Sequence, residues 1–475
     1  MKRQDIVVGL DLGTGGARAV ACTILGTIVA SGEQILHEEC ATRKPGHSEQ
    51  DASNWWTVTA SALRQLTSRF NSGDRLKAIA VSSTSGTIVP IDDRGNALAP
   101  AMMHNDTRAG KQAEEVGAAA GHPVSATFAL PKALWVKQER PEVFRKAVRF
   151  VHEADFIVGK LSGEFGVTDT FNVLKMGYDL IQNRWPDFIE TKLGIPLEML
   201  PTVVEPGEII GKVTTPAAHE TGLPEGTPVV AGATDSNAAF FASGAARDGE
   251  WNSTLGTSLA LKGISRDFIA DPLGRVYCHR HPERMWLPGG ASNTGADFMR
   301  MLFENDYEVL NSRVAERFPS TVLVYPLARK GERFPFINNE AAGFVVGNAA
   351  DRVDLFAGYM EGVAYIEKWG YDLLESLGAP VKETVYATGG GSRSNVWLQV
   401  RANALNRVLA RATFAESAMG AAIIAASRTM YPSLSDASKK MVQLESKVEP
   451  EPPLAEKYEA IYLQFRDEMK KRGYE

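Results

Sequence analysis

Two short stretches of this chain repeat one pattern, which indicates a fold with two related halves. LDLGTGGA at residues 10–17 and STLGTSLA at residues 253–260 share Leu-Gly-Thr followed by a small residue. Each opens a predicted strand-turn-strand unit. A length of 475 residues exceeds what a single hydrophobic core usually supports, so two domains are expected. We place the boundary near residue 245, which gives domains of residues 1–245 and 246–475.

The alternation of strand and helix patterns predicts an α/β protein. Short β-branched runs such as IVVGLDL (6–12) and KAIAVSST (77–84) alternate with helical stretches such as residues 52–70. The opening runs are predicted to form an antiparallel meander that feeds a larger sheet. In the second half we expect a strand at 383–388, helices at 351–378, 394–405 and 416–427, and a surface helix at 454–473.

Charge and composition point to a small-molecule partner. With 51 basic and 57 acidic residues, a net charge of −6 and no long basic block, the chain does not resemble a protein that binds nucleic acid or an acidic membrane. We expect no signal peptide, because the start MKRQDIVVGLDLG reaches an acid and a glycine turn too early. The three cysteines, Cys22, Cys40 and Cys278, offer no disulfide framework, so a cytoplasmic location is expected.

Three glycine turns are candidates for phosphate binding. They lie at residues 13–16, 256–258 and 389–392, and glycine lets backbone N–H groups approach an anion closely. The third follows an apolar strand and precedes a helix, an arrangement that suits a nucleotide. None matches GxxxxGK[ST] or GxGxxG. Each turn alone has an ordinary structural explanation, but their joint occurrence favours phosphate binding.

Asp11 stands at the tip of the first predicted strand, directly before a glycine turn. It could simply cap that turn. Beside turns that suit phosphates, the alternative is a ligand for Mg²⁺, acting through water, because Mg²⁺ takes only one or two carboxylates and keeps much of its hydration.

Asp235 stands in GATDS, where an apolar strand ends and a helix is predicted to begin at about Ser236. It could be a helix N-cap. As a catalytic group it would be a weak base at neutral pH, since a helix N-terminus stabilises the anion. A weak base suffices for phosphoryl transfer, because the attacking hydroxyl loses its proton late.

A polar cluster, HNDTRAG at residues 104–110, is a candidate for sugar binding, because each sugar hydroxyl taken from water needs a donor or an acceptor. Its members are Asn105, Asp106 and Arg108, and Ser83, Thr84 and Ser85 could add hydroxyl groups. The alternative is a solvated loop with an Asp–Arg ion pair.

Together these stretches resemble the FGGY family of carbohydrate kinases. The segments that carry the resemblance are GLDLGTGGAR, GHSEQDASNWW, HNDTR, GATDS, STLGTS and ATGGGSRSNVWLQ. TFALPKALWVKQE also resembles a family signature around Lys132, Trp135 and Glu139, although Ala129 and Ala133 depart from it. The resemblance implies two actin-like domains of the actin, hexokinase and Hsp70 superfamily around an interdomain cleft.

The resemblance also implies roles for single residues. Asp235 would activate the sugar hydroxyl, and Asp11 would serve Mg²⁺. The sugar would contact Ser85, Gly86, Asn105 and Asp106 as well as Asp235. The expected contacts of ATP are Asp11, Gly13, Thr14, Gly256, Thr257, Gly290, Gly391 and Asn395.

For the substrate, the resemblance favours D-ribulose, which would be converted to D-ribulose 5-phosphate. Xylulokinases place Met-His and glycerol kinases Arg-Glu where this chain has Ser85-Gly86. Segments such as STSGTIVPID and VYPLARKGERFP look most like the D-ribulose kinase branch, often labelled xylulokinase-like. D-Xylulose, another polyol or sugar-acid kinase activity, and an actin- or Hsp70-like ATPase scaffold remain alternatives. The oligomeric state stays open, with a homodimer as one option.

Overall fold

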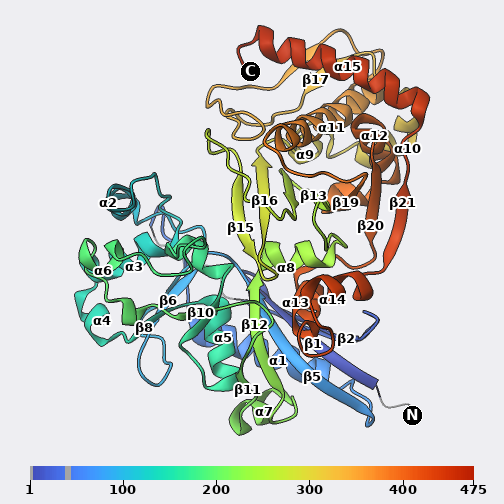
Figure 1. The fold of residues 1–475 in the computed structure, drawn as a ribbon. Coiled ribbons are helices and arrows are strands. Elements are labelled where there is room, and N and C mark those ends of the chain that lie inside the picture. The colour runs from blue at the N-terminus through green and yellow to red at the C-terminus, as the bar shows by residue number, and fades with distance from the viewer. Residues whose placement is uncertain (1–3, 38–43, 475) are drawn as a thin grey trace. The chain divides into compact units, whose positions relative to one another are not determined.

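The computed structural model describes residues 4–37 and 44–474, so Cys40 lies outside the described residues. The chain divides into two compact units, which can be followed in Figure 1. Unit 1 comprises Met1–Ala242 and Ala415–Met441, and unit 2 comprises Ser243–Phe414 and Val442–Glu475. Both contain strands and helices in alternation, which confirms the predicted α/β class.

Unit 1 is built around a mixed sheet that, in the described residues, has six strands in the order β11-β12-β5-β1-β2-β3. The first three strands form the predicted antiparallel meander, whereas β5 is parallel to β1 and β12 is parallel to β5. The strands are β1 (Gln4–Gly13), β2 (Gly16–Thr23), β3 (Ile28–Ile35), β5 (Asp74–Ser83), β11 (Ile209–Lys212) and β12 (Pro228–Thr234).

Two smaller sheets and the helices complete unit 1. The first sheet contains β4 (Glu49–Gln50), β6 (Ile88–Ile91), β7 (Ala101–Met102) and β8 (Arg149–His152), and the second contains β9 (Val167–Asp169) and β10 (Thr202–Val204). The helices are α1 (Ala52–Thr67), α2 (Gly110–Ala120), α3 (Ala129–Glu139), α4 (Pro141–Lys146), α5 (Glu153–Ser162), α6 (Phe188–Thr191), α7 (Thr215–Thr221), α8 (Asp235–Ala242), α13 (Ser417–Ala426) and α14 (Leu434–Met441), with 3₁₀ turns η1 (Asn172–Met176) and η2 (Leu197–Met199).

Unit 2 contains a second mixed sheet, with seven strands among the described residues in the order β15-β16-β14-β13-β19-β20-β21. They are β13 (Trp251–Leu255), β14 (Leu259–Gly263), β15 (Tyr277–His281), β16 (Met285–Ser292), β19 (Thr384–Thr388), β20 (Val408–Ala412) and β21 (Leu444–Val448), and a separate pair is β17 (Leu323–Tyr325) and β18 (Phe344–Val346). The helices are α9 (Asp297–Phe303), α10 (Tyr307–Arg313), α11 (Arg352–Ser376), α12 (Asn395–Leu405) and α15 (Pro452–Lys471), with 3₁₀ turns η3 (Val314–Arg317) and η4 (Gly390–Arg393).

The two large sheets follow the same plan. In each, one strand (β1 or β13) pairs antiparallel with the next strand (β2 or β14) and parallel with a later one (β5 or β19). Another parallel strand (β12 or β20) follows, flanked by an antiparallel one (β11 or β21). The two Leu-Gly-Thr stretches occupy the same turn of this plan, so the repeat in the sequence is a repeat of structure.

Helix α13 packs in unit 1, although the sequence pattern assigned it to the second half. It contacts β1 and α8. A Cβ at Gly9 of β1 would lie 2.0 Å from the carbonyl oxygen of Ala418, so only glycine allows this close approach. Residues 418–426 of the helix are all buried. A helix that is apolar on every side carries no stripe to indicate which sheet it covers.

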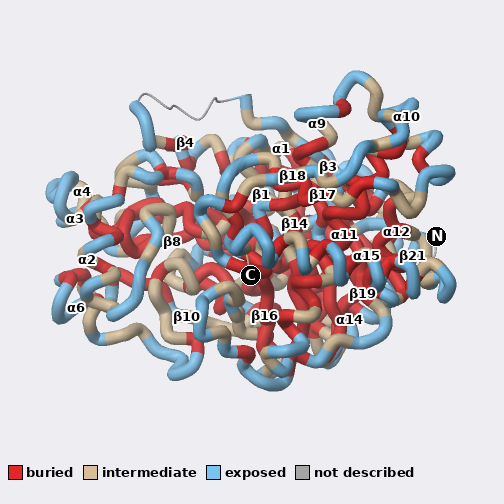
Figure 2. Tube along the Cα trace, turned by 90° about the horizontal axis from the view of Figure 1, so that it is seen from above, coloured by how far each residue is buried: buried red, intermediate tan, exposed pale blue. Residues whose placement is uncertain are grey.

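Burial is concentrated in the strands and in the helices beside them. Figure 2 shows central strands such as β1, β14 and β16 largely in red and the connecting loops in pale blue. The predicted surface helix α15 buries one face, where Tyr458 and Phe465 join the core of unit 2. None of the helices in the described residues combines the length and the apolar character needed to cross a membrane.

Candidate active site

Two carboxylates, Asp11 and Asp235, lie at one edge of the unit 1 sheet. Because β1, β5 and β12 are parallel neighbours, their carboxyl ends reach the same edge. Asp11 pairs with Ser82, and Thr234, the last residue of β12, pairs with Ser83. Asp235 follows directly as the first residue of α8. The register of three strands therefore brings together two acids that are far apart in the sequence.

The carboxylate of Asp11 is largely withdrawn from water. Burial raises the pKa of Asp11 to about 6; the hydrogen bond from Ser82 opposes this, and the charge of Asp235 adds to it. The Ser82 hydroxyl donates to Oδ1 of Asp11 at 2.7 Å. When both are ionised, the carboxylates of Asp11 and Asp235 repel each other, and a bound cation would relieve this repulsion.

This donor set fits Mg²⁺. The described residues contain no group of three or more His, Cys, Asp or Glu that could hold a metal ion. Mg²⁺ binds through one or two carboxylates and retains several waters. Asp11 is the residue of this set that would hold it.

Asp235 faces several charged or polar groups from separate elements. Its Oδ1 accepts a hydrogen bond from the N–H of Ser236 at 2.6 Å. Its negative charge also acts on Lys175 and on His104. Burial lowers the pKa of His104, so the ring is neutral near pH 7, and its buried Nδ1 has no hydrogen-bond partner among the described residues. His104 is therefore a further group that could pair with a sugar hydroxyl, which sequence reasoning overlooked although it opens the HNDTR segment.

The first glycine turn joins β1 to β2, and its Gly15 is exposed. A Cβ at Gly13 would meet nothing within 4 Å. The side-chain amide of Gln50 donates to the carbonyl oxygen of Thr14 at 3.0 Å, and Gln50 in turn accepts from the indole N–H of Trp55 at 2.9 Å. Gln50 of the HSEQD segment thus holds the backbone of the turn at Thr14 and leaves open space at Gly13.

The polar cluster predicted to bind sugar contains a buried ion pair. Asp106 is fully buried, and its Oδ2 accepts from Arg108 Nη2 at 2.6 Å and from the N–H of Ser48 at 2.7 Å. Arg108 also contacts Glu49 at 2.6 Å and lies over the ring of Trp135. The Asp–Arg pair considered from the sequence is present, but it is buried rather than solvated.

These contacts change what the cluster offers to a ligand. Both carboxylate oxygens of Asp106 already accept hydrogen bonds from the protein, so direct contact with a sugar would have to displace one of them. Asn105 is exposed. Ser85 and Gly86 form the loop that leaves β5, and their carbonyl oxygens accept from Lys175 and Lys132.

A buried acid, Glu153, binds the residue that directly precedes Ser85 and Gly86. Glu153, the first residue of α5, is fully buried, and its Oε2 accepts from the hydroxyl of Thr84 at 2.5 Å and from the N–H of Thr84 at 3.2 Å. Burial raises the pKa of Glu153 to about 8. Sequence reasoning missed this residue because no local pattern distinguishes it from an exposed acid at a helix start.

The Glu153 pKa predicts a measurable pH dependence of stability. Between the unfolded pKa of 4.5 and the folded value of about 8, only the folded state keeps the proton, so the free energy of unfolding falls as pH rises. Glu153→Gln removes this dependence. The melting temperature of the variant minus that of the wild type should increase by at least about 2 °C when the pH is raised from 5 to 8. A constant difference, equal to that of the exposed control Glu164→Gln, would contradict the assignment.

The second glycine turn lies in unit 2, between β13 and β14. A neighbouring segment holds it, since the N–H of Ala296 donates to Gly256 O at 2.8 Å and a Cβ at Gly295 would lie 2.4 Å from Thr257 O. Thr257 itself is exposed. The supporting segment was not recognised from the sequence as part of this turn.

Glu332 fixes that segment. It is buried, and its carboxylate accepts from the Ser292 hydroxyl at 2.8 Å, the Asn293 N–H at 2.7 Å and the Thr294 hydroxyl at 2.9 Å. Its position in KGERFP gave no sign of this role, because its partners precede it by about 40 residues.

The third glycine turn follows β19 and leads into α12, as predicted. Gly389 has φ of +83°, and a Cβ there would lie 2.4 Å from Leu255 O, so the turn requires glycine. Gly391 packs on the Leu255 side chain, and Asn395, the first residue of α12, is exposed. Since β13 and β19 are parallel neighbours, the second and third turns share one edge of the sheet.

Gly290 has a packing explanation instead. It is buried in β16, and a Cβ there would lie 2.2 Å from the ring of Phe334. The nucleotide contact expected for Gly290 is therefore not needed to explain the glycine.

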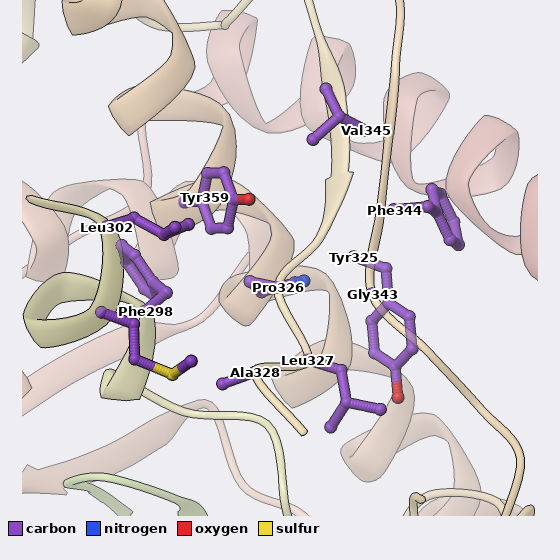
Figure 3. A pocket seen from close by; sticks show the side chains of 11 residues that line it. Phe298, Leu302, Tyr325, Pro326, Leu327, Ala328, Gly343, Phe344, Val345 and Tyr359 are labelled. Carbon is purple, nitrogen blue, oxygen red and sulfur yellow. The ribbon is translucent and has the colours of Figure 1, made fainter. Parts of the chain in front are cut away.

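An apolar pocket in unit 2 lies apart from all these residues. It has a volume of about 380 Å³, and Figure 3 shows side chains from α9, α11, β17 and β18 around it, among them Phe298, Leu302, Val345 and Tyr359. None of the residues predicted to bind sugar or nucleotide lines it. It is not the candidate active site.

Two family descriptions match most of the chain. Residues 6–242 match "FGGY family of carbohydrate kinases, N-terminal domain", and residues 254–429 match the corresponding C-terminal domain.

Individual relatives cover nearly the whole chain. It is 26% identical to the xylulose kinase of Bacillus subtilis over 97% of this chain and 96% of that protein. It is 29% identical to the xylulose kinase of Streptomyces coelicolor over 83% of this chain and 82% of that protein. The crystal structure of xylulose kinase from Rhodospirillum rubrum superposes with a TM-score of 0.86 at 27% identity, covering 98% of both chains. The predicted actin-like α/β fold is confirmed.

Proposed function

Because the chain belongs to the FGGY family of carbohydrate kinases, we propose that it transfers the terminal phosphate of ATP to a hydroxyl group of D-ribulose, giving D-ribulose 5-phosphate. It is an ATP-dependent sugar phosphotransferase. The observation that carries the proposal is the pair of carboxylates, Asp11 and Asp235, at one edge of the unit 1 sheet, beside an open glycine turn.

Asp235 orients the attacking hydroxyl and accepts its proton. In the transfer, the sugar oxygen forms a bond to the terminal phosphorus, the bond from that phosphorus to the ADP oxygen breaks, and the hydroxyl proton passes to the Asp235 carboxylate. The transition state is loose, so orientation of the oxygen matters more than basicity. A carboxylate at the start of α8, kept anionic by the helix N-terminus, suits this task.

Asp11 would hold hydrated Mg²⁺, which would supply positive charge to neutralise the phosphates. Gly13 and Thr14 in unit 1 and Gly256 and Thr257 in unit 2 bind phosphate oxygens through backbone N–H groups.

Gly391 and Asn395 contact the adenosine, where η4 and α12 follow β19. Gly389, Gly390 and Asn395 are exposed in this turn before a helix N-terminus, which supports this role, whereas Gly391 itself is buried. Gly290 is also proposed to contact the nucleotide, although its packing against the Phe334 ring is by itself enough to explain a glycine at this position.

D-Ribulose is preferred over D-xylulose because of Ser85-Gly86. Xylulokinases have Met-His at these positions, and Gly86 adopts φ of +90°, a conformation that disfavours histidine. The second candidate, D-xylulose, is favoured by the names of the relatives. The two ketopentoses differ at one hydroxyl-bearing carbon, so a polar site that pairs that hydroxyl can separate them.

The test measures ADP release by the full chain with MgATP and each of several sugars. We expect turnover to depend strictly on an added ketopentose, with kcat/KM for D-ribulose at least about tenfold above that for D-xylulose. A higher kcat/KM for D-xylulose than for D-ribulose would make D-xylulose the assigned substrate, and the assigned reaction would stay the same. ATP turnover that is independent of every sugar would favour an ATPase scaffold and overturn the proposal.

A further inference from the structure

Two lysines hold the carbonyl oxygens of two consecutive residues in unit 1. Lys132 Nζ, from α3, donates to Gly86 O at 2.8 Å, and Lys175 Nζ, from η1, donates to Ser85 O at 3.0 Å. Lys132 also donates to Met103 O at 2.7 Å. A single ammonium group thus joins the Ser85-Gly86 loop to the segment that continues into His104.

Burying the ammonium group of Lys132 at this position costs free energy. Its side chain is fully buried, and its acceptors are neutral carbonyl oxygens rather than a carboxylate. Burial lowers the pKa of Lys132 to about 7, although the charge of Asp106 opposes this. Packing alone would be served by an apolar side chain, so a buried ammonium group beside a candidate site indicates a functional constraint.

The loop between the lysines has little freedom. Gly86 has φ of +90°, and a Cβ there would lie 2.9 Å from Lys175 Cδ and 3.1 Å from Thr127 O. Two residues before Gly86, the N–H and the hydroxyl group of Thr84 donate to Glu153. Backbone groups on both sides of Ser85 are therefore fixed by charged or acidic side chains from three separate elements.

Lys175 also connects this loop to the catalytic carboxylate. It is half-buried, which lowers its pKa, and the negative charge of Asp235 acts in the opposite direction. The loop, the lysine and Asp235 thus form one group of neighbours within unit 1.

We propose that Lys132 and Lys175 are positioning residues that set sugar specificity by clamping the Ser85-Gly86 loop against α3 and η1. The inference rests on the proposed function, because it requires that Ser85 and Gly86 contact the sugar. A site distinguishes stereoisomers only if its donors and acceptors stay where one isomer needs them. Release of either carbonyl lets the loop adapt to the wrong isomer.

The test compares Lys132→Met and Lys175→Met with Lys137→Met. Lys137 is a matched control, because it lies on the same helix as Lys132 and also donates to a carbonyl oxygen, that of Leu193 at 2.6 Å. Leu193 is not part of the Ser85-Gly86 loop. The main readout is the ratio of kcat/KM for D-ribulose to that for D-xylulose. This ratio does not depend on the fraction of enzyme that is folded, so partial loss of stability cannot imitate the effect.

We expect each clamp variant to lower the ratio by about fivefold or more and to raise KM for the sugar by about tenfold, with KM for ATP within about twofold of the wild type. Lys137→Met should leave all three values within about twofold. A ratio that changes less than this in the clamp variants, or equally in the control, overturns the proposal. If Lys132→Met yields no folded protein, Lys175→Met decides the outcome, since its lysine is only half-buried.

Failure of the proposed function is visible before any variant is made. If the wild type phosphorylates neither ketopentose, the substrate assignment fails. The clamp is then tested by the same ratio for the sugar that the wild type accepts and its stereoisomer at one carbon. Differential scanning fluorimetry with sugar alone gives a second readout. The melting-temperature increase on adding the sugar should be lost in the clamp variants and kept in Lys137→Met.

Discussion

Asp235→Asn should lower kcat by at least about 10²-fold, the usual scale for a positioned acid or base, while the protein stays folded. Asparagine keeps the shape of the side chain and can still contact the sugar hydroxyl, but it cannot accept a proton. KM for the sugar should therefore change much less than kcat.

The same substitution separates catalysis from helix capping. Asp235 begins α8 and accepts from the N–H of Ser236, so a structural role is the main alternative. Asparagine caps helices about as well as aspartate, and a residue that only capped the helix would tolerate the change. The melting temperature should therefore stay within about 2 °C of the wild type.

The measurement is steady-state kinetics with MgATP and the ketose, next to thermal unfolding. Asp351→Asn is the control, because Asp351 is the N-cap of α11 and accepts from the N–H of Asp354 at 2.8 Å. It should retain normal activity. An Asp235→Asn enzyme with normal kcat would remove the proposed base.

Asp11→Asn should combine a large loss of activity with a gain in stability. We expect kcat/KM for MgATP to fall by at least about 10²-fold, because the neutral amide holds a hydrated cation poorly. The ligand-free protein should nevertheless be harder to unfold at neutral pH.

The gain in stability follows from the sign of the pKa change. The pKa of Asp11 rises from 3.8 to about 6 on folding, so the folded state binds this proton more tightly than the unfolded state. The wild type therefore loses stability as pH rises from about 4 to about 6, and the loss is complete above that range. At about 1.4 kcal/mol per pH unit, asparagine recovers at most about 3 kcal/mol at pH 7.

Thermal unfolding without Mg²⁺ or nucleotide checks this expectation. Asp5→Asn is the matched control on the same strand, since Asp5 forms a salt bridge with Arg75 at 2.8 Å at the opposite end of β1. It should be neutral or slightly destabilising at pH 7. If Asp11→Asn were also destabilising at pH 7 and regained no stability relative to the wild type between pH 4 and pH 7, Asp11 would not be a strained carboxylate.

Short stretches of sequence were enough to name the candidate residues for catalysis and phosphate binding. Asp11, Asp235 and the glycine turns each stand where an apolar run ends, and a strand end is encoded within about ten residues by periodicity and turn chemistry. The repeated Leu-Gly-Thr likewise predicts two related halves from the sequence alone.

The sugar side was less predictable. The contact between Asp106 and a sugar stays a prediction, and the sequence did not show that Arg108 and Ser48 donate to the oxygens of Asp106. Among the groups that surround the Ser85-Gly86 loop, Glu153 and Lys175 carried no local signal. Lys132 belongs to the TFALPKALWVKQE signature, but the sequence did not show which groups it contacts. The partners of all three residues lie about 30 to 90 residues away. An acid or a lysine in a helix is ordinary until its environment is known.

The sequence by itself therefore determined the α/β class, the duplicated plan and the candidate residues for proton transfer and phosphate binding. Only the tertiary structure decided which of these residues meet, which helix covers β1, and which charges are buried. The physical reason is that strand and turn preferences are local, whereas burial, hydrogen-bond pairing and pKa depend on segments that folding brings together from distant positions.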